Sequence, residues 1–251
     1  MCNFMGYTVS RSVFIKLLQI EKELGTLAAL QQLKDGFKYG NSVVLIAKGD
    51  NDVEAKEMHW EYIPSFIRSM AELIEWRKKG IPWLNAKGEN LFINDKGKKS
   101  MWADAAMKRR CLVLATHFYE WRHFKPEGAK KDIAYPYRIG AKNFEQLYMA
   151  GLWTPWTDKE TGETMDTFAI VTTKGNEIME KIHNTKKRMP VILTEELAHE
   201  WIFGKLSQER ITEIGTSQFA ASEMEYYTIK KDFKAALDPT EAFEFEELPA
   251  L

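Results

Sequence analysis

The chain has little cysteine and no long apolar run. Its 251 residues include two cysteines, Cys2 and Cys111, so at most one disulfide could form, which argues against a secreted disulfide scaffold. No segment approaches about 18 consecutive apolar residues, as a membrane-spanning helix would need. The first residues also lack a basic region followed by a long apolar stretch. We therefore expect a globular protein of the reducing cytoplasm, with no membrane partner.

Signatures of a bound metal or cofactor are also missing. The five histidines are scattered, and there is no Cys-x-x-Cys pair, so we expect no metal site. Neither a Gly-x-Gly-x-x-Gly run nor a Walker-type phosphate loop occurs, so no nucleotide cofactor is indicated. Any chemistry is expected to come from side chains and the backbone alone.

Positive charge is not in excess overall, but charge is unevenly distributed. The net charge is −1, and residues 238–251 carry five acidic side chains and no Lys or Arg, which leaves residues 1–237 with a formal charge of +4. A mildly basic body can attract a polyanion such as nucleic acid. We predict a folded domain over residues 1–237 and a flexible acidic tail over 238–251.

Hydrophobic periodicity predicts alternating blocks of helix and strand. Helices are expected at 12–34, 68–79, 175–182, 194–203 and 207–215. Strands are expected at 43–46, 111–115, 118–123, 135–140, 147–153, 167–173 and 226–229, most of them rich in aromatic or β-branched residues. The interpretation is one α+β domain, in which a curved, mainly antiparallel, barrel-like β-sheet is flanked by helices.

Cys2 directly follows the initiator methionine. Removal of Met1 would leave one residue with both a free α-amine, of ordinary pKa about 8, and a thiol, of ordinary pKa about 8.5. The amine can condense with an aldehyde to a Schiff base, and the nearby thiol can close on the same carbon to give a thiazolidine ring. On position alone, an ordinary second residue remains the alternative. Cys111 lies in an apolar run and is expected to be a buried structural thiol.

Three other segments place polar side chains among apolar neighbours. Asn85 follows a helix stop and is either a site residue or a turn residue that bonds its own backbone. Glu120 lies in an aromatic strand, on the face opposite its neighbours, and so faces either solvent or a cleft. His183 stands at a helix exit, and although a lone histidine is often structural, the following cations could hold phosphate: Lys186, Lys187 and Arg188.

Taken in order, these segments resemble one known family. The segments are Met1-Cys2-Asn3, Trp60-Glu61-Tyr62-Ile63-Pro64-Ser65-Phe66, Asn85-Ala86-Lys87, Arg109-Arg110-Cys111-Leu112-Val113, Phe118-Tyr119-Glu120-Trp121, Ala150-Gly151-Leu152-Trp153, Phe168-Ala169-Ile170-Val171-Thr172-Thr173, and His183 with Arg188-Met189-Pro190-Val191-Ile192-Leu193. The chain is similar to SOS response-associated peptidase (SRAP) domain proteins from residue 2 to about residue 230.

The resemblance implies a sensor that captures abasic sites in single-stranded DNA, including sites at single-strand/double-strand junctions, through a thiazolidine link to Cys2. It implies that Asn85 orients the linked sugar, that Glu120 exchanges protons with the Cys2 amine and the developing hydroxyl, and that His183 serves sugar ring opening and slow reversal. It further implies a DNA-binding surface: Asn3, Pro64, Lys87, Thr173, Lys186, Lys187 and Arg188. We expect a monomer.

The chain departs from the family pattern at four places. Lys87 replaces the usual arginine, so a bidentate phosphate fork becomes a point charge. Asn184-Thr185-Lys186-Lys187 widens the usual spacing between His183 and the Arg-Met-Pro segment, and adds two lysines. Asn3 replaces a common glycine, which reduces backbone freedom beside the nucleophile. His117 stands where the family often has another residue, and is expected to be structural or on the surface.

Two other functions stay open at this point. A thiol peptidase could use Cys2, with a base such as His183, even if its sole substrate were its own leader. A non-covalent single-stranded DNA-binding module would use basic and aromatic side chains without chemistry. Blocking the α-amine separates the first from the covalent sensor, and Cys2→Ala separates the second.

Overall fold

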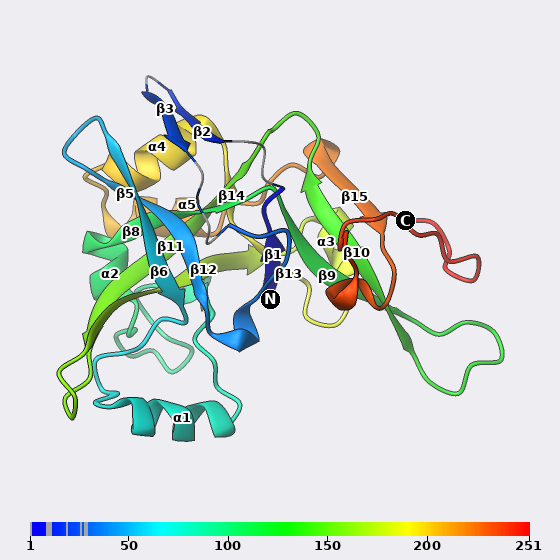
Figure 1. Ribbon diagram of the computed structural model, residues 1–251, viewed down its shortest axis with the longest axis horizontal. Coiled ribbons are helices and arrows are strands. Elements are labelled where there is room, and N and C mark those ends of the chain that lie inside the picture. Colours follow the sequence, from blue (N-terminus) through cyan, green and yellow to red (C-terminus); the bar gives the residue numbers. More distant parts are fainter. Residues whose placement is uncertain (1, 9–11, 19, 26, 28–29) are drawn as a thin grey trace.

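A closed ring of five strands forms the centre of the computed structural model, which describes residues 2–8, 12–18, 20–25, 27 and 30–251 (Figure 1). The ring runs through β12 (Thr164–Lys174), β6 (Val53–Trp60), β5 (Asn41–Ala47), β8 (Arg110–Ala115) and β11 (Leu147–Thr157), which pairs back with β12. Within the ring the β12–β6 pair is parallel and the others are antiparallel. Three short strands pair with the ring: β7 (Asn85–Lys87), β13 (Arg188–Pro190) and β14 (Ile192–Leu193).

A second sheet lies beside the ring and carries the N-terminal segment. Its order is β15 (Met224–Thr228), β10 (Ile133–Ala141), β9 (His117–Phe124), β1 (Phe4–Gly6) and β4 (Lys34–Asp35), with antiparallel pairing throughout. The β9–β10 hairpin projects well beyond the body (Figure 1). A separate antiparallel hairpin consists of β2 (Val13–Leu17) and β3 (Ile20–Gly25).

The described residues form five α-helices. They are α1 (Met70–Lys78), α2 (Ala103–Lys108), α3 (Glu177–Ile182), α4 (Glu195–Phe203) and α5 (Gln208–Gly215), with single 3-10 turns at Gly36–Lys38, Gly88–Asn90, Ala221–Glu223 and Phe233–Ala235. Of these helices, α2, α3, α4 and α5 pack against the sheets and α1 lies apart from them (Figure 1). Four of the helices begin at a side-chain oxygen that accepts a backbone N–H of the first turn, which stabilises the start of each helix; the residues are Ser69, Asn176, Thr194 and Ser207. No helix in the described part of the chain is long and apolar enough to cross a membrane.

Alternate residues of the ring strands pack into two different clusters. In β8, Leu112 and Leu114 join the cluster that includes Trp201 of α4, whereas Cys111 and Val113 join the cluster that includes Cys2 and α3 residues. Strand geometry explains the division, because successive side chains point to opposite faces. The second cluster fills the space between the ring and the second sheet, and so fixes the position of Cys2.

The expected α+β fold with a curved, mainly antiparallel, barrel-like sheet is confirmed. The expected helix at 12–34 is wrong over the residues that the structure describes, because they form β2, β3, the start of β4 and non-helical connections; residues 19, 26, 28 and 29 lie outside the described part. In β2 the buried residues Val13, Ile15 and Leu17 alternate with exposed ones, which is the period of a strand. The leucines whose spacing suggested a helix lie instead in the β2–β3 hairpin and in the segment that follows it. The sequence prediction also missed β1, β6 and α2.

The acidic segment 238–251 lies against the second sheet. Tyr135 donates its hydroxyl hydrogen to Glu247 at 3.0 Å, Arg122 donates to the carbonyl of Pro249 at 2.5 Å, and Lys230 pairs with Glu241 at 2.7 Å. These contacts say where the segment lies, while its flexibility stays a prediction.

Gly88 is expected to tolerate no side chain. A Cβ at this position would lie 1.7 Å from the carbonyl oxygen of Gly215, at the end of α5. Because the Gly215 oxygen belongs to the backbone and cannot turn away, Gly88→Ala should lower the free energy of unfolding by about 1 to 3 kcal/mol or more, as overpacking of a dense core does. Urea unfolding measures the effect. Gly40→Ala is the control, because a Cβ there meets no atom within 4 Å; equal stability of the two variants would contradict the prediction.

Candidate active site

The N-terminal segment is held as an inner strand of the second sheet. In β1, Met5 pairs with Phe118 of β9 on one side, and Phe4 pairs with Asp35 of β4 on the other. Cys2 precedes this strand by two residues and is fully buried, with its Sγ 3.9 Å from the carbonyl oxygen of Phe4. Burial, reinforced by the negative charge of Glu120, raises the pKa of the Cys2 thiol far above its ordinary value. The thiol is therefore protonated near neutral pH and needs a base to react.

Glu120 and His183 meet directly behind this segment. Glu120 comes from the middle of β9 and His183 from the C-terminal cap of α3, and Glu120 Oε2 lies 3.7 Å from His183 Nε2. The Nδ1 atom of His183 lies 2.9 Å from the carbonyl oxygen of Arg188. Because a carbonyl only accepts, Nδ1 carries the ring proton, so Nε2 of the neutral ring presents its lone pair towards Glu120.

Burial moves the two pKa values in opposite directions. It raises the pKa of Glu120 to about 7 and lowers that of His183 to about 4. Near neutral pH the imidazole is therefore uncharged, and the carboxyl group is divided between its acidic and basic forms. A group with a pKa close to the working pH is suited to move protons in either direction.

Asn85 is linked to the residue after Cys2. Its Nδ2 donates to the side-chain oxygen of Asn3 at 3.0 Å. Asn85 opens β7, and parallel pairing with β12 places it opposite Ile170. The two asparagines also line one cleft of about 440 Å³, together with Lys186. The structure thus gathers the four expected catalytic residues around the N-terminal segment: Cys2, Asn85, Glu120 and His183.

The residues expected to bind DNA lie in different environments. Pro64 and Thr173 are buried, and the Thr173 hydroxyl donates to the carbonyl of Thr216 at 3.0 Å. Lys87 is half exposed and pairs with Asp95 at 3.4 Å. Lys186 and Lys187 are exposed, and neither is in an ion pair within the described part of the chain.

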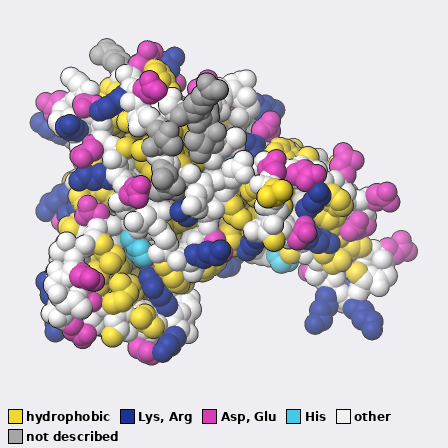
Figure 2. All heavy atoms as spheres, in the orientation of Figure 1, with side chains coloured by type: hydrophobic (Ala, Val, Ile, Leu, Met, Phe, Trp, Pro, Cys, Tyr) yellow, Lys and Arg dark blue, Asp and Glu magenta, His cyan; other side chains and the backbone are white. Residues whose placement is uncertain are grey.

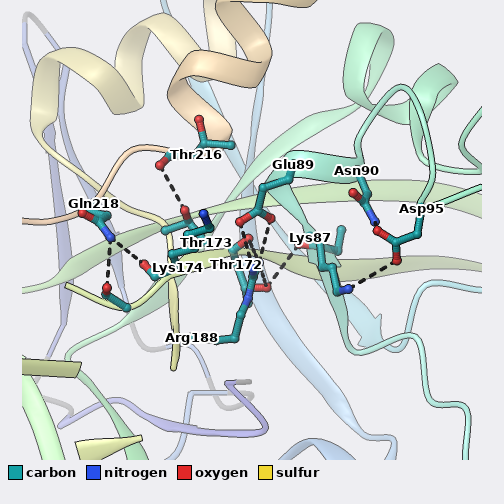
Figure 3. Close-up of polar contacts among 12 residues, drawn as sticks. Lys87, Glu89, Asn90, Asp95, Thr172, Thr173, Lys174, Arg188, Thr216 and Gln218 are labelled. Atoms are coloured by element: carbon teal, nitrogen blue, oxygen red, sulfur yellow. Dashed lines mark hydrogen bonds and ion pairs between the residues drawn. The ribbon is translucent and has the colours of Figure 1, made fainter. Parts of the chain in front are cut away.

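Arg188 is engaged inside the protein. Its guanidinium donates to both carboxylate oxygens of Glu89, at 2.8 and 3.0 Å, and to the carbonyl of Thr172 at 2.6 Å (Figure 3). A bidentate pair of this kind fixes the geometry of the guanidinium and cancels its charge. The sequence interpretation did not include Glu89, although a carboxylate two residues after Lys87 in a turn was the available signal.

Other expected roles can be compared with the structure. Cys111 is fully buried in the second cluster, as expected for a structural thiol. His117 is buried and bonds to the hydroxyl groups of Thr116 and Tyr119, so its role is structural. Across the described ranges, no group of three or more His, Cys, Asp or Glu side chains could hold a metal ion.

The Glu120–His183 pair should give two opposing pH dependences of stability. Between about pH 4.5 and 7 the folded protein keeps the Glu120 proton that the unfolded chain releases, so this group lowers stability as pH rises. Between about pH 4 and 6.5 His183 is protonated in the unfolded chain but neutral in the folded protein, so this group raises the free energy of unfolding as pH rises. In the wild type the two effects partly cancel.

Single variants should separate the two effects. In Glu120→Gln, stability should rise with pH between 4.5 and 6.5, and in His183→Gln it should fall, each by at most about 1.4 kcal/mol per pH unit relative to the wild type. Urea unfolding at several pH values measures both slopes. Glu127→Gln, at an exposed position of the β9–β10 hairpin, is the control. Parallel pH curves for the wild type and both site variants would contradict the assignment.

Comparisons of the sequence and of the fold with known proteins point to the same family. The profile of the family described as SOS response associated peptidase (SRAP) matches residues 6–236. The chain is 32% identical over 189 residues to abasic site processing protein YoqW of Bacillus subtilis, and the match covers 75% of each chain. It is 27% identical over 178 residues to abasic site processing protein YedK of Escherichia coli, and this match covers 71% of the present chain and 68% of YedK. A crystal structure of a protein from Bacteroides thetaiotaomicron superposes with a TM-score of 0.71 at 33% identity, over 84% of this chain and 82% of the other.

Proposed function

The chain belongs to the SOS response-associated peptidase family, and from this premise we propose that it captures abasic sites in single-stranded DNA by forming a thiazolidine with Cys2. The relatives named as abasic site processing proteins support the substrate. The observation that carries the proposal is the buried Glu120–His183 pair, placed next to the only residue whose amine and thiol can share one carbon.

The reaction begins once Met1 is removed and the Cys2 amine is free. The Glu120 carboxylate accepts a proton from the amine, which then attacks the aldehyde carbon of the ring-opened sugar. The carbinol oxygen takes up this proton and a second one from the nitrogen and leaves as water, and a protonated imine remains. The Cys2 sulfur adds to the imine carbon and its proton passes to the nitrogen, which closes the five-membered ring. Aldehyde and aminothiol thus become thiazolidine and one water.

His183 and Asn85 would serve the sugar. Nε2 of His183, uncharged at neutral pH, can accept the sugar hydroxyl proton as the ring opens and return it during reversal. The Asn85 amide, held by Asn3, can donate to a sugar hydroxyl beside the new ring. A site without bulk water would favour the imine over its hydrolysis, and the burial of Glu120 and Cys2 is consistent with this.

A denaturing gel tests the proposal. Mature protein should form a denaturant-resistant complex with single-stranded DNA that contains one abasic site, and none with an oligonucleotide that carries an intact base. Mass spectrometry first confirms that Met1 is absent. If mature protein binds both oligonucleotides equally and leaves no covalent complex, the proposal fails and the non-covalent binding module gains support.

Acetylation of the mature α-amine separates the sensor from a thiol peptidase, the activity in the family's name. Ring formation needs the free amine, whereas attack of a thiolate on a peptide does not. Acetylated protein should lose the covalent complex. Hydrolysis of a peptide that survives acetylation would instead identify a peptidase.

A further inference from the structure

A cleft next to the expected catalytic residues is built partly by the segment 184–187, which widens the usual family spacing. The cleft has a volume of about 440 Å³, and its polar lining includes Asn3, Asn85 and Lys186. A volume of this size suits a small-molecule fragment such as one nucleotide. The cleft adjoins the proposed site, because Asn85 lines it and Asn3, which follows Cys2 in the chain, lines it too.

Lys186 is the cation of this cleft whose charge is not cancelled by a carboxylate within the described part of the chain. The other cation, Arg77, donates to Oε2 of the fully buried Glu61 at 2.6 and 2.8 Å. Arg77 also stacks on the ring of Tyr39, 3.7 Å from its centroid, and so serves as a wall. The cleft therefore carries a net positive charge at Lys186, and its lining also includes the aromatic side chains of Phe37 and Tyr39.

The turn that carries Lys186 is held in place by Asn184. The Asn184 side chain accepts a hydrogen bond from the backbone N–H of His123 at 3.0 Å, and its amide donates to the carbonyl of His123 at 2.7 Å. His123 lies on β9, three residues after Glu120, so the turn is attached to the strand that carries the base. Lys187 adopts a left-handed backbone conformation, with φ of 50°, which bends the turn sharply.

Lys186 also acts on the catalytic pair electrostatically. Burial has the largest effect on Glu120 and His183, and the Lys186 charge lowers the pKa of both. The ammonium group is therefore near the place where the sugar would be held. In Figure 2 the outline of the molecule is concave between the lobe with α1 and the projecting hairpin, and Lys and Arg side chains lie along that edge.

We infer that this cleft binds the nucleotide adjoining the captured sugar, with Lys186 on its phosphate and Asn184 as the residue that positions Lys186. The inference rests on the proposed function and names a second subsite for it. Lys186 forms no ion pair with a carboxylate of the described residues, and a phosphodiester would supply the negative charge. The rings of Phe37 and Tyr39, which also line the cleft, offer surfaces on which a nucleotide base can stack. Nothing in this assignment requires Arg188, whose charge Glu89 already cancels.

The test measures the rate of covalent complex formation with protein in excess, at increasing protein concentration. Lys186→Ala should raise the half-saturating concentration about tenfold, as loss of a charged hydrogen bond does, and leave the maximal rate unchanged. In a plot of the logarithm of the apparent affinity against the logarithm of the salt concentration, the slope should become shallower by about 0.7, the value for one phosphate of a single strand. Asn184→Ala should also raise the half-saturating concentration, but by a smaller factor.

Lys130→Ala is the matched control, because it removes the same charge at an exposed position of the β9–β10 hairpin, outside the expected DNA-binding surface. It should change the half-saturating concentration less than threefold, roughly the effect of a distant surface charge. A neutral methylphosphonate placed on either side of the abasic site identifies the phosphate. On one side of the abasic site, the methylphosphonate should weaken DNA binding by the wild type as much as Lys186→Ala does. It should have no further effect on binding by the Lys186→Ala variant.

The outcomes separate this inference from the proposed function. If the wild type forms no covalent complex, the proposed function itself fails. If the wild type forms the complex but Lys186→Ala and Lys130→Ala have equal half-saturating concentrations, or neither methylphosphonate weakens binding, the phosphate site is overturned and the sensor stands. A fall in maximal rate with unchanged half-saturation would show that Lys186 acts only on the pKa values of the pair.

Discussion

Cys2→Ala should abolish the denaturant-resistant complex with abasic DNA. The variant keeps the α-amine, so it can still form an imine, but it has no sulfur to close the ring, and an imine hydrolyses during denaturation. The expected loss is complete within the detection of a gel. Quantified band intensity over time, for mature protein with Met1 removed, is the measurement.

Borohydride should rescue a complex from the same variant. Reduction converts the imine to a stable amine, so Cys2→Ala should give a covalent band only when the reductant is present. This result would assign the first bond to the amine and the second to the thiol. Cys111→Ala is the matched control, since it removes the other buried thiol, which lies on β8 of the ring. A stable complex from Cys2→Ala without reductant would contradict the thiazolidine.

Glu120→Gln should slow complex formation by about 10² to 10³-fold, the range in which general acid–base catalysis contributes. Glutamine has nearly the same shape and keeps a polar group beside His183, so the fold should be preserved. It cannot accept the amine proton, however, and the uncatalysed transfer to water is slower. Single-turnover rates, with a thermal unfolding curve for each variant, measure the effect.

The pH profile provides the more specific test. Since burial raises the pKa of Glu120 to about 7, the wild-type rate should rise with pH through about 7, as the carboxylate forms. The Gln variant should lack this rise, and Glu120→Asp should retain it with a lower rate. Glu127→Gln, on the exposed hairpin, should follow the wild type. An unchanged profile in Glu120→Gln would assign the proton transfers to another group.

The chemistry available at the N-terminus and most of the helices and strands could be predicted from the sequence alone. A penultimate cysteine defines an aminothiol whatever the fold, and period-two alternation placed Glu120 on the face opposite Tyr119. Strands with strong local patterns, such as β8 and β9, were predicted within one or two residues. The order of the motifs was enough to indicate the family.

Which of these residues lie together depends on the three-dimensional fold and could not be predicted from local sequence. Cys2, Glu120 and His183 come from distant parts of the chain, and their proximity follows from sheet pairing that no local pattern encodes. The pKa values of Glu120 and His183 depend on burial, which is a property of the packed core. The pairing of Arg188 with Glu89 and the attachment of Asn184 to β9 likewise needed the fold, because each joins segments separated by 61 residues or more. Local sequence sets what a residue can do, while long-range packing sets its neighbours and its exposure to water.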